Sequence, residues 1–260
     1  MMLTKRLKLR TFSLFSPFQN IRRLSSISNR PFQIAIDGPA ASGKSTTAKL
    51  VAEELKFTYL NTGNLYRTVT LKALEEDLWS KKNKYFDQEL TELASKLDIR
   101  LDGNHVWLEG RDVSKEIRNV DVTSRVSEVA KVAGVRECLS KIQRELACRP
   151  LEKDFQALKG IVMEGRDIGS SVLPAADIKV FLDANVKSRA LRRFKELKGE
   201  ATLEEIETAI RLRDESDYRR AISPLVKPKD ATIVDTSNLT IPEQVAIIVT
   251  LAKKRISNSD

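Results

Sequence analysis

Apolar residues follow two spacings along the chain, and each spacing predicts one kind of element. Short apolar runs predict buried strands at 32–36, 160–164, 178–183 and 231–235. Apolar residues three or four apart predict helices between these runs, including one long helix from about Val122 to Cys148. Strands separated by helices form a parallel sheet covered on both faces, so the fold class is α/β.

One segment interrupts this alternation. Residues 99–101 and 106–108 predict two short strands, joined by a polar turn at 102–104. We therefore expect a small antiparallel β element inserted among helices.

The basic charge of the chain is concentrated at its N-terminal end. The formal net charge is +9, but residues 1–30 contain seven basic side chains and no acidic one. Without these seven, 38 basic and 36 acidic groups remain. That near balance gives no electrostatic reason to expect a nucleic-acid partner.

Residues 1–30 have the composition of a mitochondrial transit peptide. They are rich in Arg and Ser and lack the apolar run of a secretory signal. The sequence RRLSS at 22–26 resembles a matrix processing site, with a cut expected near Leu24. A disordered basic arm is the alternative. We expect the mitochondrial matrix as the location, and no membrane partner because no run is long enough to cross a bilayer.

A phosphate-binding loop follows the first predicted strand. Its glycines, lysine and serine have the G-x-x-x-x-G-K-[ST] spacing, and a predicted helix follows, as the motif requires. In such a loop backbone N–H groups point at phosphate oxygens, Lys44 reaches the β- and γ-phosphates, and Ser45 binds Mg²⁺. The motif assigns the ATP phosphates to Gly38, Pro39, Ala40, Ala41, Ser42, Gly43, Lys44, Ser45 and Thr46.

The remaining chemistry must proceed without imidazole. His105 is the only histidine and lies in the predicted hairpin, while Cys138 and Cys148 lack the spacing of a metal or redox motif. Phosphoryl transfer needs positive charge and fixed geometry more than covalent help. An acceptor that is itself a phosphate, with a second pKa of about 6, needs no general base.

The helix expected after residue 202 turns a charged face inward. Its apolar residues at 203, 206 and 210 define a buried stripe, and at 100° per residue Arg213 and Asp217 continue it, with Arg220 near its edge. Inward charges are costly unless they meet a partner or polar ligand, so this helix end is predicted to face a site. An exposed i,i+4 pair is the alternative.

The segment MEGRD follows a buried strand and therefore lies at the carboxyl edge of the sheet, where α/β folds bind ligands. Glu164 is the candidate for organising Mg²⁺ through water. Arg166 is directed to phosphate, and Asp167 can accept a hydrogen bond from an amino group. Asp183, at the end of IKVFLD, is the alternative metal-binding acid.

Together these segments resemble the bacterial-type cytidylate kinases, which are P-loop nucleoside monophosphate kinases. The matching segments are GPAASGKST, NTGNLYR, VSKEIR, VTSRVSEVAKVAGVRE, VMEGRDIGSSVLPAADIKVFLDA and RDESDYRRAISPL, in family order. The resemblance implies transfer of the γ-phosphoryl group from ATP, with Mg²⁺, to CMP or dCMP. It also implies a kinase domain at 31–260, with a monophosphate-binding region at about 61–150, a β insert at about 98–118 and a mobile lid. We expect a monomer.

The resemblance also assigns roles to residues. The acceptor-binding set is Thr62, Arg67, Ser127, Arg136, Arg166, Asp167, Arg213, Asp217 and Arg220. Within it, Arg67, Arg166 and Arg220 match phosphate-binding positions. Ser127, Arg136 and Asp167 match positions that read the cytosine edge, and Arg213 and Asp217 match ribose contacts. The catalytic set is Lys44, Arg166, Arg213 and Arg220.

Three lid arginines and two departures from the family complete the picture. By the resemblance, the segment around Arg189, Arg192 and Arg193 matches the mobile lid over ATP, but for each of these arginines taken alone a solvated helix face is the default expectation. The family has aspartate where this chain has Asn61, and many members have aspartate where it has Glu164. A kinase of the same fold acting on UMP or AMP, or a P-loop module without catalysis, are the rival functions.

Overall fold

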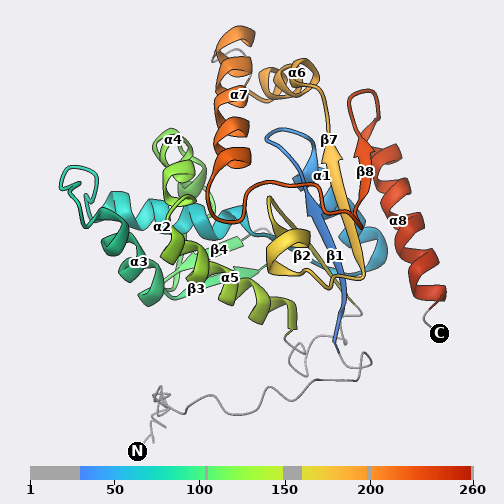
Figure 1. Ribbon diagram of the computed structural model, residues 1–260, viewed down its shortest axis with the longest axis horizontal. Coiled ribbons are helices and arrows are strands. Elements are labelled where there is room, and N and C mark those ends of the chain that lie inside the picture. The colour runs from blue at the N-terminus through green and yellow to red at the C-terminus, as the bar shows by residue number, and fades with distance from the viewer. Residues whose placement is uncertain (1–29, 103–104, 149–159, 198–200, 259–260) are drawn as a thin grey trace, which may run out of the picture.

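A five-stranded parallel sheet forms the centre of the computed structural model (Figure 1). The structure describes residues 30–102, 105–148, 160–197 and 201–258. The strand order is β2-β6-β1-β7-β8, with bounds β1 Phe32–Asp37, β2 Thr58–Asn61, β6 Gly160–Gly165, β7 Ile178–Asp183 and β8 Thr232–Asp235. The four strands predicted from apolar runs are confirmed, whereas β2 was missed because it is short and only Leu60 in it is buried.

Helices cover both faces of this sheet. Helices α1 (Lys44–Leu55) and α8 (Ile241–Ser257) pack on one face, around Ile34, Ile36 and Val162. The other face packs against the end of α5 (Ala133–Cys148) and the π-helical turn Ile168–Val172. The strands are therefore buried on both sides, as expected of a parallel sheet.

The inserted β element lies within a helical region. Strands β3 (Ile99–Asp102), β4 (His105–Leu108) and β5 (Arg111–Asp112) form an antiparallel sheet in that order. The first two strands are confirmed, and the two-residue β5 was missed. The neighbouring helical elements are α2 (Gly63–Glu75), α3 (Phe86–Lys96), α4 (Val120–Val129) and the 3-10 turn Glu116–Arg118.

The single helix predicted from Val122 to Cys148 is wrong. The chain forms α4 and α5, with a break at residues 130–132, where the N–H groups of Lys131 and Val132 donate to carbonyls three residues back. The break leaves the carbonyl of Ala130 to accept a 3.0 Å hydrogen bond from Arg136 Nη1. The apolar spacing continues through the break, so periodicity alone did not reveal it.

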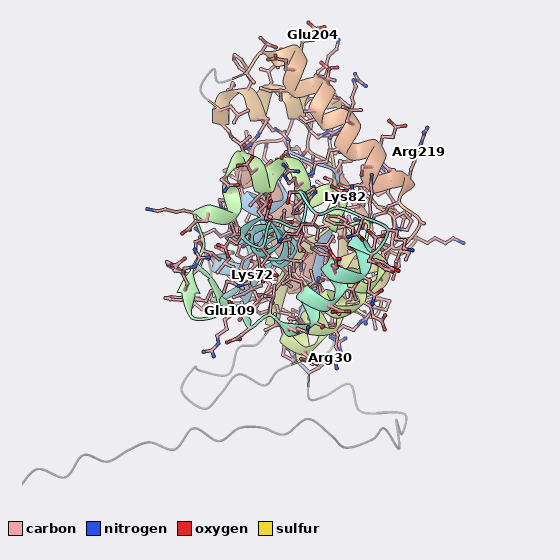
Figure 2. The ribbon with its side chains drawn as sticks, turned by 90° about the vertical axis from the view of Figure 1, so that its left-hand side faces the viewer. Arg30, Lys72, Lys82, Glu109, Glu204 and Arg219 are labelled. Atoms are coloured by element: carbon pink, nitrogen blue, oxygen red, sulfur yellow. The ribbon has the colours of Figure 1, made fainter. Side chains whose placement is uncertain are left out.

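Two helices project beyond the carboxyl edge of the sheet. They are α6 (Val186–Leu197) and α7 (Leu203–Arg219), which pack against each other above the strands (Figure 1). Glu204, near the start of α7, lies at the far end of this projection (Figure 2). Among the residues that the structure describes, no helix is long and apolar enough to cross a membrane.

Candidate active site

The phosphate-binding loop lies where β1 ends, between the sheet and the projecting helices. Two of its glycines are required by the backbone. Gly38 has φ +152°, and a Cβ there would lie 2.1 Å from the Leu182 carbonyl oxygen, while Gly43 has φ +91° immediately before α1. Lys44 is buried and donates to Ser42 Oγ at 3.2 Å. Burial, with Arg166 nearby, lowers the pKa of Lys44.

A hydroxyl and a carboxylate meet beside the loop. Ser45 Oγ donates to Glu164 Oε2 at 3.0 Å, and the Tyr59 hydroxyl donates to Glu164 Oε1 at 2.5 Å. Burial and the Glu164 charge raise the pKa of Tyr59, so it remains a donor. The alternative acid, Asp183, instead pairs with Lys227 at 2.7 Å. Hard oxygen donors such as Ser45 and Glu164 suit Mg²⁺, which keeps several waters and phosphate oxygens as its other ligands.

Asp37 joins the phosphate-binding loop to the segment that follows β6. Its side chain is buried and accepts from the N–H groups of Ile168 at 2.8 Å and Gly169 at 2.7 Å. Burial raises the pKa of Asp37 from 3.8 to about 6, against the lowering effect of these two hydrogen bonds. Sequence reasoning missed this residue, because its partners lie more than a hundred positions away.

Charged side chains from three elements meet on the other side of the loop. Asp167, after β6, pairs with Arg136 of α5 at 2.6 Å and lies 3.5 Å from Arg220, which follows α7. Asp217 of α7 pairs with Arg166 Nε at 2.8 Å. Asp167, Asp217, Arg136 and Arg220 are all buried. The inward placement of Asp217 that the helical spacing predicted is confirmed.

An arginine cluster lies beside this network. Burial, followed by the charges of Arg213, Arg118, Arg193 and Arg166, lowers the pKa of Arg67 to about 10. Burial and Arg166 likewise lower the pKa of Arg213 to about 10. Cations that depress one another's pKa create a positive potential, which favours a phosphate dianion.

Thr62, Arg67, Ser127 and Arg136 are also members of the predicted acceptor-binding set. Thr62 is buried at the start of α2, and its hydroxyl donates to the Glu164 carbonyl at 2.8 Å. Arg67 Nη1 donates to Ile117 O at 2.9 Å and to Thr123 Oγ1 at 3.0 Å. Ser127 is half-buried on α4, which contacts α7. The Arg136 guanidinium lies 5.3 Å from the Tyr66 ring centroid. Arg118, in the family segment VSKEIR, was not singled out from the sequence.

The three lid arginines differ in environment. Arg193 is half-buried and pairs with Glu196 at 2.9 Å, and Arg192 donates to Thr236 Oγ1 at 3.1 Å. Arg189 is only 4% exposed and pairs with Asp214 of α7. The solvated helix face that was the default expectation for Arg189 is therefore wrong.

The sheet, the loop and the buried charges together define a class of protein. A P-loop at one strand end, a carboxylate beside its serine and an arginine cluster across the same edge are the parts of a P-loop nucleoside monophosphate kinase. The predicted α/β fold of this class is confirmed.

Comparison with known proteins identifies the family. Residues 34–254 match the family model for cytidylate kinase. The chain is 47% identical over 233 residues to the cytidylate kinase of Chloroherpeton thalassium, covering 86% of this chain and 94% of that protein. It is 47% identical over 227 residues to that of Desulforamulus reducens, covering 85% and 96%. The chain belongs to the cytidylate kinase family, and the enzyme class predicted from its sequence is confirmed.

Proposed function

We propose that the chain transfers the γ-phosphoryl group of ATP to the phosphate of CMP or dCMP. The observation that carries this proposal is the buried network of Asp167 with Arg136 and Arg220, beside the arginine cluster and at the same sheet edge as the P-loop. A buried carboxylate can accept from an exocyclic amino group, and cytosine presents one where uracil presents an oxygen.

The donor nucleotide occupies the P-loop. The loop at residues 38–46 binds its β- and γ-phosphates through the ammonium of Lys44 and through backbone N–H groups. Pro39 has no N–H to offer, and the N–H of Ala40 donates to Asp214 Oδ1 instead. Ser45 and Glu164, whose side chains are hydrogen-bonded at 3.0 Å, would hold Mg²⁺ and its waters. Bound with ATP, Mg²⁺ would offset the negative charge of the transferred group.

The acceptor nucleotide occupies the side-chain network. Arg67, Arg166 and Arg220 bind its phosphate, and Arg213 and Asp217 contact its ribose. Thr62 helps to hold the acceptor nucleotide, while Ser127, Arg136 and Asp167 contact the edge of its cytosine base. The acceptor oxygen is largely ionised at neutral pH, so these residues need only to position it and balance its charge. Lys44, Arg166, Arg213 and Arg220 are the groups that stabilise charge during transfer.

A panel of monophosphates tests this assignment. Steady-state kcat/KM with ATP and Mg²⁺ should be highest for CMP and dCMP. If UMP or AMP exceeds both by tenfold, the base assignment is wrong. If none of the four is phosphorylated while ATP still binds, the chain is a P-loop module without catalysis. The same assay with N61D measures whether Asn61 sets the ratio of CMP to dCMP.

Residues 1–30 are proposed to direct the chain to the mitochondrial matrix. Support comes from their composition, with seven basic and no acidic side chains, and from their position outside the region that matches the family. A fluorescent reporter fused to these residues should enter mitochondria, and a cytosolic reporter would refute the proposal. We further propose that the kinase is a monomer, which light scattering on the purified chain tests.

A further inference from the structure

Both backbone polar groups of Ala40, in the middle of the P-loop, are held by side chains from the projecting helices. The N–H of Ala40 donates to Asp214 Oδ1 at 3.1 Å, and its carbonyl accepts from Arg189 Nη1 at 3.0 Å. Arg189 and Asp214 also pair with each other. All three residues are at most 7% exposed. Neither side chain has a role in the reaction described above.

The pair is placed to join three parts of the molecule. Arg189 lies in the first turn of α6, and its Nε donates to the Ala184 carbonyl at 2.9 Å, which fixes it to the end of β7. Asp214 lies on α7 between Arg213 and Asp217, which are proposed to contact the acceptor ribose. The donor loop and the helix that carries Arg213 and Asp217 are thus connected through a single loop residue, Ala40.

The loop conformation gives a reason for this support. Ala41 has φ +56°, in the left-handed region that a residue with a side chain seldom adopts. Such a backbone persists only where its surroundings hold it in place. The buried Arg–Asp pair is weak support for stability, because desolvation offsets much of its attraction. Its geometry, with a planar guanidinium donating to two carbonyls and a carboxylate, serves positioning better.

We propose that Arg189 and Asp214 are positioning residues that fix Ala40 and so set the distance between the donor phosphates and the acceptor site. They also join the first turn of α6 to the C-terminal half of α7. Transfer requires reacting atoms within about 3.5 Å, and an error of about 1 Å can cost a hundredfold in rate. The proposal rests on ATP binding to the P-loop.

The test distinguishes an effect of Asp214 on the donor loop from an effect on its neighbours in the acceptor site, Arg213 and Asp217. In D214A, we expect kcat to fall about 30-fold and ATP affinity about tenfold, with CMP affinity changed less than twofold. Calorimetric titrations with ATP alone and with CMP alone measure the two affinities. D214N keeps an oxygen for the Ala40 N–H and should recover at least threefold of the lost rate. The control is E215A, the next residue on α7, which is exposed and should match the wild type.

A double variant and a conservative one complete the test. Because both side chains hold the same residue, Ala40, and also pair with each other, R189M/D214A should be no more than about threefold worse than the poorer single variant. R189K keeps a positive charge beside Asp214 and is the variant to measure if D214A does not fold. It should show the same preferential loss of affinity for ATP over CMP. Equal losses of ATP and CMP affinity, or wild-type kinetics in every variant, would overturn the proposal. Failure of the wild-type chain to bind ATP would instead refute the proposed function.

Discussion

The donor and acceptor sites share one edge of the sheet but are built in different ways. The donor site is one continuous loop, residues 38–46, whose glycines adopt backbone angles that a side chain would hinder. The acceptor site draws side chains from α2, α5, the end of β6 and the end of α7, and joins them by buried ion pairs such as Arg136–Asp167. A backbone site is set by local sequence, whereas a side-chain site exists only after the chain has folded. Substitutions at the two sites should therefore have different effects.

Lys44→Ala should have the largest effect of the proposed substitutions. This effect should be limited to the donor site. Loss of a charge that stabilises the transferred group should lower kcat about 1,000-fold, while CMP affinity measured without ATP changes less than twofold. ADP release in a coupled assay gives kcat, and calorimetry gives the CMP affinity. The exposed Lys253→Ala should match the wild type. A loss of CMP affinity as large as the loss of ATP affinity would show that the two sites are not separable.

Asp37 lies on the border between the two sites, and its titration should appear in the stability of the fold. The folded protein keeps the proton until about pH 6, whereas the unfolded chain releases it near 3.8. Unfolding therefore releases a proton between these values, so stability falls as pH rises through this window, by on the order of 3 kcal/mol from this group, and not further above it. In D37N this fall should be absent.

Urea unfolding at pH 4.5 and pH 6.5 measures this prediction. The unfolding free energy of the wild type minus that of D37N should fall as pH rises, because only the wild type has a carboxyl group that loses its proton in this range. The exposed Asp87→Asn should keep the wild-type pH dependence. Identical pH dependence in D37N and the wild type would show that Asp37 does not hold its proton in the folded state.

The same contrast explains what could be predicted from the sequence. The P-loop motif is contiguous, and the helical spacing placed Asp217 inward, so both could be found from local patterns. The contacts of Asp37 and Arg189 could not, because their partners Ile168 and Ala40 are far away in the sequence. The roles of Arg67 and Arg136 came only from the family resemblance, since nothing local distinguishes them from surface arginines. The break between α4 and α5 escaped because apolar spacing continues across it.

Arg67→Ala should impair the acceptor site and leave the donor site intact, which is the opposite of the effect expected for Lys44→Ala. Removing one charge-assisted contact to phosphate should raise KM for CMP about 30-fold while KM for ATP changes less than twofold. Thr123→Val removes a hydrogen-bond partner of Arg67 but keeps the charge, so its KM for CMP should rise less than threefold. If both KM values rise together in R67A, the arginine cluster serves the donor as well as the acceptor.

Asp167→Ala should have the smallest effect of these substitutions. The effect is measured as a change in the ratio of kcat/KM for CMP to kcat/KM for UMP. If Asp167 accepts from the cytosine amino group, its loss lowers kcat/KM for CMP more than for UMP, and the preference for CMP should fall about tenfold. Asp217→Ala is the matched control, since Asp217 also contacts Arg220, at 3.6 Å, but is assigned to the ribose. It should lower kcat/KM for both nucleotides and leave their ratio within twofold. Equal losses for CMP and UMP in D167A would place base recognition elsewhere in the acceptor site and leave Asp167 only the task of holding Arg136 and Arg220.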